Sequence, residues 1–227
     1  NKIIIEELKK NFPHSHAHYI VEPNGVDFSS FTGIEKSEAR ERLGLPSDVP
    51  IALYTGRFFE WKGLEILPQA AAKTPSIRWQ IVGGDRSDFI RFANGPLPEN
   101  CMFAGSRPHN EMPLWFSAAD VLLVLGTARD IQSYRYTSPM KLFEYLASGR
   151  TIVASNTPAI REIVSEQEAI FYTPDDPLDL AQAVQSAVRD SGELSVRTEA
   201  ATRLAAASSW RARAERIMHF IEKTTCR

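Results

Sequence analysis

The chain has 227 residues with 26 basic and 28 acidic side chains, and its formal net charge of −2 gives it no overall attraction to nucleic acid or anionic lipid. Hydrophobic residues make up 43% and charged residues 24%, which excludes a wholly disordered or collagen-like chain. Cys101 and Cys226 form no C-x-x-C motif and indicate neither a disulfide framework nor a thiolate zinc site, so we expect a reducing, cytoplasmic compartment. No apolar run approaches the roughly 18 residues of a transmembrane helix.

The first residues have a pattern of their own. Residues 3–10 have helical spacing, residues 17–21 favour a short strand, and Pro23-Asn24-Gly25 is a turn signal. Because the sequence opens on Asn1 rather than Met, we expect this region to be a connector that enters a sheet domain from a larger part outside the chain. Residues 1–22 are therefore assigned to the remnant of an N-terminal half and its connector.

Three histidines alternate within this connector. His14, His16 and His18 would share one face of a strand, a spacing that zinc or nickel could use. No carboxylate or cysteine follows them at ligand spacing. The sequence therefore predicts no metal site.

Short apolar runs alternate with helical segments over most of the remaining chain. Strands that are apolar nearly throughout are typical of a parallel sheet covered on both faces, and helices between them indicate right-handed crossovers. The predicted strands are Ile51–Thr55, Ile77–Val82, Cys101–Ala104, Val121–Leu125, Thr151–Ala154 and Ala169–Tyr172. The predicted helices are residues 37–43, 63–73, 108–118, 139–148, 158–164, 178–189, 193–207 and 210–223. The sequence thus predicts a doubly wound α/β sheet of about six strands with three extra C-terminal helices.

The segment after the first strand has the residues of a phosphate clamp. In a doubly wound sheet, ligands bind where loops leave the carboxyl ends of the strands. Gly56-Arg57 and Lys62-Gly63 place two cations beside a helix start, where backbone N–H groups and positive charge favour an anion. The alternative interpretation is a solvated basic turn.

Other common α/β motifs are absent from the sequence. It contains neither the G-x-G-x-x-G fingerprint nor the G-x-x-x-x-G-K-[ST] loop, which argues against a dinucleotide-dependent dehydrogenase and a P-loop NTPase. It also lacks a G-x-S-x-G nucleophile elbow. Gly83-Gly84-Asp85, after the second strand, could bring bare backbone to a ligand, and a tight turn is the alternative.

A long polar loop precedes the helix that follows the fourth strand. We expect this loop, residues 126–137, to be mobile without ligand and to order around it, as lids at such edges do. Ser138 is predicted to be the N-cap and Pro139 the first helical residue, so this start is a second anion-ready site. Lys141 and Glu144 lie on the same helix, and a surface ion pair between them is the alternative to a binding role.

Five motifs, taken in order, resemble one family. They are Pro23-Asn-Gly-Val-Asp27, Gly56-Arg57 with Lys62-Gly63, Phe103-x-Gly105, Ala118-Ala-Asp120 before an apolar strand, and Glu144-Tyr-Leu-Ala-Ser-Gly149 followed by Thr151-Ile-Val-Ala-Ser155. Together they resemble the C-terminal, donor-binding half of a retaining glycosyltransferase of the GT-B type, in the glycosyl transferases group 1 family. The resemblance runs from about residue 18 to the end and includes Trp210 on a last helix.

The resemblance implies roles for individual residues. Arg57 and Lys62 match the family's donor-diphosphate cations and are the implied catalytic pair, and Glu144 matches a glutamate that hydrogen-bonds the donor ribose. An earlier glutamate of the family, which contacts the sugar, falls on Tyr136, so a phenol or an aromatic face is expected there. The implied donor-binding residues are Gly56, Gly83, Arg107, Tyr136, Ser138, Pro139, Met140, Lys141 and Glu144.

Two of these assignments rest on position within a segment. Arg107 belongs to residues 104–112, which by the resemblance would lie near the nucleobase. Ser138-Pro139 replaces a Phe-Gly pair of the family, a departure that leaves the identity of the sugar open while the helix start stays suited to the diphosphate.

The resemblance also implies two Rossmann-like halves that face each other across a cleft. Residues 23–207 are expected to bind the nucleotide-diphosphate sugar, and residues 208–227 to form a helix that crosses back to an N-terminal half holding a sugar, glycan or lipid-linked acceptor. Transfer of a hexose-type sugar with retention, in cytoplasmic glycan biosynthesis and without a metal or other cofactor, is the implied activity. Peripheral association with a membrane is compatible with it, and no nucleic-acid partner is expected.

Other classes of protein would account for part of the pattern. A non-catalytic α/β module that binds a nucleotide or phosphorylated ligand is the alternative function. A receiver-type signalling domain would need an acidic pocket after the first strand, where Gly56-Arg57 stands instead. Because catalysis requires a positioned acceptor, we expect this chain by itself to bind donor without turnover.

Overall fold

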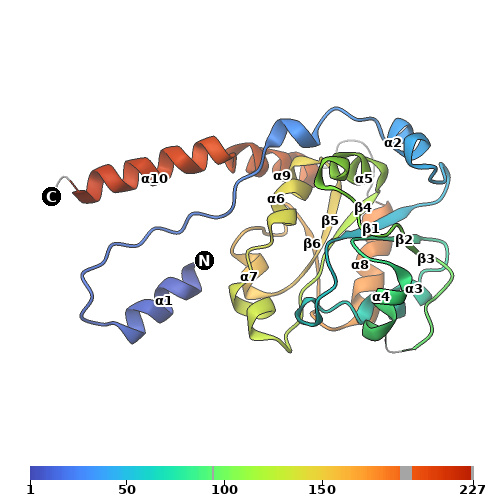
Figure 1. Cartoon of the computed structure of the whole chain (residues 1–227), viewed down its shortest axis with the longest axis horizontal. Coiled ribbons are helices and arrows are strands. Elements are labelled where there is room, and N and C mark those ends of the chain that lie inside the picture. The colour runs from blue at the N-terminus through green and yellow to red at the C-terminus, as the bar shows by residue number, and fades with distance from the viewer. Residues whose placement is uncertain (94, 190–195, 226–227) are drawn as a thin grey trace.

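Six parallel strands form the centre of the structure (Figure 1). The computed structural model describes residues 1–93, 95–189 and 196–225. Its strands are β1 (Ile51–Thr55), β2 (Arg78–Val82), β3 (Cys101–Phe103), β4 (Val121–Val124), β5 (Thr151–Ser155) and β6 (Ile170–Tyr172). They are hydrogen-bonded in the order β3-β2-β1-β4-β5-β6, and all five neighbouring pairs are parallel. The predicted α/β, Rossmann-like doubly wound sheet is confirmed.

Helices cover both faces of this sheet (Figure 1). The core of one face includes side chains from α3 (Ile66–Ala72), α4 (Arg86–Phe89) and α8 (Pro177–Arg189). The core of the other face includes side chains from α5 (Met112–Ala118), α6 (Met140–Ala147) and α9 (Val196–Ala207). The remaining elements are α1 (Lys2–Asn11), η1 (Phe28–Phe31), α2 (Lys36–Leu43), η2 (Glu60–Lys62), η3 (Ile90–Phe92), η4 (His109–Glu111), η5 (Gln132–Tyr136), α7 (Pro158–Arg161) and α10 (Trp210–Thr225).

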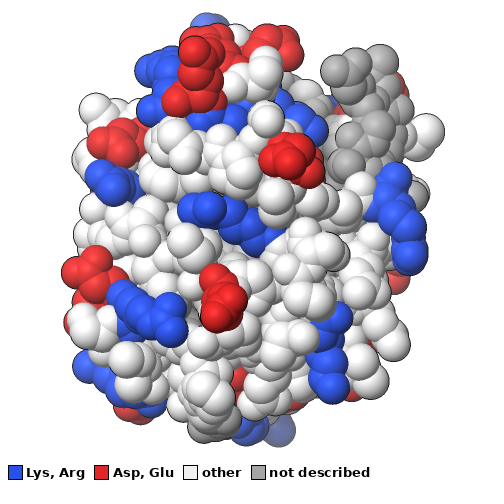
Figure 2. All heavy atoms as spheres, turned by 90° about the vertical axis from the view of Figure 1, so that its right-hand side faces the viewer, with Lys and Arg blue, Asp and Glu red and all other residues white. Residues whose placement is uncertain are grey.

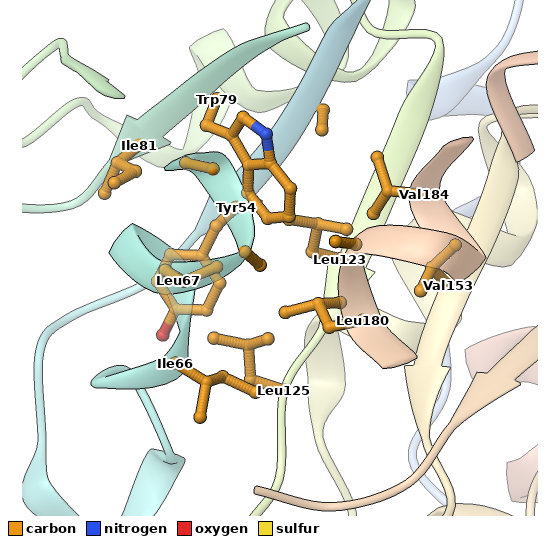
Figure 3. Packing of buried hydrophobic residues seen from close by; sticks show 14 of the residues in the cluster. Tyr54, Ile66, Leu67, Trp79, Ile81, Leu123, Leu125, Val153, Leu180 and Val184 are labelled. Carbon is orange, nitrogen blue, oxygen red and sulfur yellow. The ribbon is translucent and has the colours of Figure 1, made fainter. Parts of the chain in front are cut away.

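The side chains of β4 show why these strands are apolar throughout. Val121 and Leu123 belong to the cluster beneath α3 and α8, whereas Leu122 and Val124 belong to the cluster beneath α5 and α6. Successive strand residues point to opposite faces, so a strand covered on both sides buries all of its side chains. Figure 3 shows the first cluster, with Tyr54 packed among aliphatic residues. Each such side chain contributes roughly 1.5–3 kcal/mol of burial free energy.

Some sequence predictions differ from the structure in the existence or the bounds of an element. The strand predicted at residues 17–21 is wrong, because this mostly exposed segment pairs with no strand in the described part of the chain. The helix predicted from residue 63 begins at Ile66, since Gly63 adopts a left-handed conformation that closes η2. The predicted helix 193–207 is α9 from Val196 onward, and residues 193–195 lie outside the described part of the chain.

A buried charge network holds α2 against the amino-terminal edge of the sheet. Asp120, just before β4, accepts a hydrogen bond from the Arg40 guanidinium at 2.6 Å and another from the Ile51 backbone N–H at 2.7 Å. Lys36 Nζ lies 3.0 Å from its other carboxylate oxygen. Arg40 also donates to the carbonyls of Ala118 and Ser47. Both charges of the Arg40–Asp120 pair are thus fully hydrogen-bonded, as a buried ion pair requires.

The segment that leads from the connector into the sheet domain packs against the start of α10. The Val26 N–H donates to the Ser208 carbonyl at 3.0 Å. A side-chain carbon on Gly25 would lie 2.6 Å from the Trp210 indole, so only glycine lets the connector backbone approach that ring. Arg213 donates to the Pro23 carbonyl. From this junction α10 extends away from the sheet domain (Figure 1).

One face of the molecule has mixed charge. On the face drawn in Figure 2, Lys and Arg side chains alternate with Asp and Glu without a broad field of one sign. Within the described residues, no helix is both long and apolar enough to cross a membrane. The same residues contain no group of three or more His, Cys, Asp or Glu placed to hold a metal ion.

Candidate functional site

The strand order reverses between β1 and β4, at the middle of the sheet. The chain leaves β1 toward α3 on one face, and it leaves β4 toward α6 on the other. The two connections therefore diverge, which is the position where doubly wound sheets bind ligands. The sequence-predicted residues after β1, β2 and β4 all belong to this edge.

Two glycines bring the ends of β1 and β2 together. Gly56 has a φ of 133° and Gly83 a φ of 130°, values that side-chain-bearing residues rarely adopt. A β-carbon on Gly83 would lie 2.3 Å from the Gly56 carbonyl oxygen, so no larger residue fits. A β-carbon on Gly56 would lie 3.6 Å from Lys62 Nζ. Both glycines thus expose backbone at the predicted edge.

Lys62 projects back over the end of β1. Its Nζ donates to the Arg57 carbonyl at 2.9 Å and lies 4.9 Å from the Phe59 ring centroid and 5.4 Å from that of Trp61. Burial, followed by the nearby Arg57 guanidinium, lowers the pKa of Lys62. Arg57 is exposed, and its guanidinium has no ion pair among the described residues.

Lys141 reaches the same place from α6. Its Nζ donates to the Thr55 carbonyl at 3.1 Å and lies 4.0 Å above the Tyr54 ring. Burial, followed by repulsion from Lys62, lowers the pKa of Lys141 well below its ordinary value, and Glu144 acts in the opposite direction. The alternative interpretation, a surface ion pair between Lys141 and Glu144, does not form among the described residues, where each side chain has another hydrogen-bond partner.

Three cations therefore converge on one edge without a carboxylate bonded to them. Arg57, Lys62 and Lys141 form no salt bridge in the described part of the chain, although other basic residues do. The buried Tyr54 hydroxyl, next to Gly56, also has no hydrogen-bond partner among the described residues. Positive charge and unpaired polar groups of this kind favour an anionic ligand.

The start of α6 differs in detail from the prediction. The N-cap is Pro139 and the first helical residue is Met140, whereas Ser138 as N-cap and Pro139 as first residue were predicted. Ser138 makes no capping bond: its Oγ is buried without a partner in the described structure, and its carbonyl accepts a hydrogen bond from the Asn24 amide at 3.0 Å. Pro139 has a φ of −73° and a ψ of 118°, and this extended conformation places the helix start one residue later. The free N–H groups of α6 still belong to this edge.

Glu144 lies one turn further along α6. Its Oε1 is 2.7 Å from His109 Nε2, and the Glu144 side chain is largely buried whereas that of His109 is 73% exposed. His109 is on η4, within the segment predicted to lie near a nucleobase. Arg107, in the same segment, is exposed. The structure thus brings Glu144 and this segment together.

The loop over residues 126–137 contains local structure. Gln132–Tyr136 forms one turn of π-helix, and Asp130 caps it by accepting hydrogen bonds from the N–H groups of Gln132 and Ser133. Arg129 forms ion pairs with Glu65 and Asp175. These contacts order the loop in the described structure, and its mobility without ligand stays a prediction.

Tyr136 makes its main contact with the first helix. Its hydroxyl donates to the Glu7 carboxylate of α1 at 2.8 Å, which raises the pKa of Tyr136. The N-terminus of α1 is bound close by, because the Glu162 carboxylate accepts hydrogen bonds from the N–H groups of Lys2 and Ile3. The connector helix therefore lies against the loop that was predicted to contact the sugar.

Comparison with known proteins decides the family. The model of the family "Glycosyl transferases group 1" matches residues 35–205, which is most of the chain. The chain belongs to the glycosyl transferases group 1 family. Phosphatidyl-myo-inositol mannosyltransferase from Mycobacterium tuberculosis is 29% identical over 166 residues, which cover 71% of this chain and 41% of that protein.

Solved structures agree with this glycosyltransferase assignment at the level of the fold. Sucrose-phosphate synthase from Thermosynechococcus elongatus superposes with a TM-score of 0.78 and 24% identity, over 98% of this chain and 56% of that one. HepE from Anabaena, solved in complex with UDP, superposes with a TM-score of 0.71 and 20% identity, over 88% of this chain and 56% of that one. The chain therefore spans about half the length of these proteins and has the fold of one half of a GT-B glycosyltransferase.

The sequence analysis did not predict several residues of this glycosyltransferase domain that contact the predicted site residues. Tyr54, His109 and Glu7 each contact a predicted site residue, but each is far from that residue in the sequence or has no motif around it. The apolar context of Tyr54 predicts a core residue, which it is. The local sequence does not predict that the Tyr54 side chain lies near the cations, because its position relative to Lys141 depends on the packing of α6 against β1.

Proposed function

We propose that this domain binds the diphosphate of a nucleotide-sugar donor at the carboxyl edge of β1 and β4. The observation that carries the proposal is that Lys62 Nζ, beside Gly56, and Lys141 Nζ, on the Thr55 carbonyl, both lie at the end of β1. Arg57 is close enough to affect the pKa of Lys62, and among the described residues no carboxylate forms a salt bridge with any of the three cations. Charge-assisted hydrogen bonds to phosphate oxygens are each about 1.5–3 kcal/mol, and the free N–H groups at the start of α6 add to them.

Glu144 is proposed to hold the ribose of that donor. A carboxylate is an acceptor-only group and can take hydrogen bonds from two adjacent hydroxyls. In the empty site its Oε1 is occupied by His109, an exposed side chain whose displacement into solvent has a small cost. Binding of the ribose therefore exchanges one hydrogen bond for two.

The same residues suit the chemistry of sugar transfer. Breaking the anomeric C–O bond leaves negative charge on the departing nucleotide diphosphate, and oriented cations with helix N–H groups stabilise that charge. This arrangement supports a reaction that needs no metal ion. Retention of configuration, with the donor phosphate helping to accept the acceptor proton, is the stereochemical course that we propose from the family.

The parent protein is proposed to be a cytoplasmic hexosyltransferase of glycan biosynthesis. Support comes from the mannosyltransferase name of the relative and from the UDP bound to HepE. The acceptor, a sugar, glycan or lipid-linked molecule, is assigned to an N-terminal half. This chain by itself is proposed to bind donor without transferring sugar, because it does not position the acceptor hydroxyl.

Calorimetric titration tests the donor site. Arg57→Ala and Lys62→Ala should each weaken UDP, GDP or ADP, whichever binds, by roughly 10- to 100-fold. Lys73→Ala, which removes an exposed cation just after α3, is the matched control and should leave the affinity unchanged. Unchanged affinity in both site variants would contradict the proposal that Arg57 and Lys62 bind the diphosphate. Binding without transfer by the longer parent, tested with several nucleotide sugars and acceptors, would favour the non-catalytic module instead.

A further inference from the structure

Lys141 has an environment that an ordinary phosphate-binding lysine does not need. Its side chain is half-buried, and its ammonium nitrogen lies 3.1 Å from the Thr55 carbonyl, 4.0 Å from the centroid of the Tyr54 ring and 6.0 Å from that of Tyr145. An ammonium group has three N–H donors, and the described structure gives this one a single hydrogen-bond acceptor. A charge held in this way is poorly compensated while the site is empty.

The charged and titratable groups around Lys141 disfavour its protonated form. Lys62 faces it from η2 and repels a second positive charge, while Tyr54 from β1 and Tyr145 from α6 present rings whose hydroxyls stay protonated because burial raises their pKa values. Among the described residues, Glu144 on the same helix is the carboxylate that raises the pKa of Lys141, and it is hydrogen-bonded to His109. Burial and Lys62 together outweigh Glu144 and lower the pKa of Lys141 well below its ordinary value.

We propose that Lys141 is a charge-switching residue, neutral while the donor site is empty and protonated when a diphosphate occupies it. The inference rests on the proposed function, because the diphosphate supplies the negative charge. On binding, the Nζ lone pair takes one proton from solvent, and the resulting ammonium donates hydrogen bonds to phosphate oxygens. No other reactant is required, and the proton returns to solvent when the diphosphate leaves.

Two consequences follow from this switch. The empty site avoids holding two ammonium groups side by side, whereas the occupied site gains a third cation beside Arg57 and Lys62. The gain depends on the charge of the ligand, so the switch favours a diphosphate over a nucleoside monophosphate or a nucleoside. Affinity should also fall as pH rises from the pKa of Lys141 in the empty site to its higher pKa in the complex.

Proton uptake during binding is the direct test. We would titrate UDP, GDP and ADP into the chain by calorimetry at about pH 8, in two buffers of different ionisation enthalpy, because the last phosphate ionisation of these nucleotides is complete at that pH. The expected uptake is up to about one proton per diphosphate for the wild type. Lys141→Met and Lys141→Arg should abolish it, because methionine has no titrating group and arginine stays protonated. Lys73→Met is the control and should keep it.

A second measurement addresses the empty protein and remains informative if a variant folds poorly. Carbon-13 NMR of the lysine side chains, with Lys141→Arg used to assign the signal, should show Lys141 titrating below the other lysines without ligand and moving upward with pyrophosphate. An ordinary titration in the empty protein would overturn the inference, as would binding with no proton uptake or with the same uptake in Lys141→Met. Failure to bind any diphosphate would overturn the proposed function and, with it, the switch. Binding without proton uptake would overturn the switch alone.

Discussion

The two edges of the sheet differ in whether their basic side chains are paired with a carboxylate. At the amino-terminal edge, Arg40 and Lys36 share the carboxylate of Asp120, and every charge has hydrogen-bond partners. At the carboxyl edge, Lys62 and Lys141 face each other with backbone carbonyls and aromatic rings around them. A buried charge is costly unless it is paired and hydrogen-bonded. The first edge therefore compensates its charges within the fold, whereas the second leaves its basic side chains available for a ligand at some cost in stability.

The largest effect is expected at the paired edge. Asp120→Ala removes the acceptor of Arg40, Lys36 and the Ile51 N–H, and leaves a buried guanidinium without its counter-charge. The free energy of unfolding should fall by about 3–5 kcal/mol. Urea denaturation measures it, with Glu38→Gln, which breaks an exposed pair with Arg42, as a control that should change stability by less than about 0.5 kcal/mol. Similar losses in the two variants would contradict the contrast between buried and exposed charge.

A smaller effect is expected where β1 and β2 meet at the ligand edge. Gly83→Ala adds a β-carbon that would lie 2.3 Å from the Gly56 carbonyl oxygen, at a φ that alanine rarely adopts. We expect a loss of roughly 1–3 kcal/mol in stability together with weaker nucleotide binding, since Gly56 is displaced beside Lys62. Gly95→Ala is the control, because its φ is also positive but a β-carbon there meets nothing within 4 Å. Equal nucleotide affinity in Gly83→Ala and wild type would show that the junction of these two strands does not shape the site.

The smallest effect has the opposite sign. Folding of the ligand-free wild type either deprotonates Lys141 or buries its charge, and both are unfavourable at pH 6. Lys141→Met removes this cost, so the variant should gain about 1 kcal/mol of stability at that pH. Because the folded pKa of Lys141 lies below its unfolded value, the unfolded chain binds more protons between the two values, and wild-type stability rises with pH in that range. The advantage of the variant should therefore be largest below the folded pKa and disappear toward the ordinary lysine value. Thermal unfolding at several pH values measures it, and a variant that is less stable at every pH would place Lys141 with the structural charges instead.

Local sequence patterns were sufficient to predict the sheet, most of its helices and the types of residue at the ligand edge. The six apolar runs are local signals, since a strand buried on both faces must be apolar throughout, and five motifs in order carried the family. Gly56, Arg57, Lys62 and Gly83 follow the strands directly, so parallel topology alone places them at one edge. The short strand at residues 17–21 failed because a strand needs a partner that local sequence does not specify.

Tertiary structure decided which groups meet. Lys141 contacts Thr55 and Glu144 contacts His109, although the helical spacing of Lys141 and Glu144 would also allow them to pair with each other. Arg40 and Asp120 are 80 positions apart and pair because α2 packs beside α5. Contacts of this kind depend on strand register and on the packing of helices against the sheet, which are set by the whole core. The sequence therefore predicts which types of residue lie at the site, whereas their protonation, hydrogen-bond partners and distances depend on the tertiary structure.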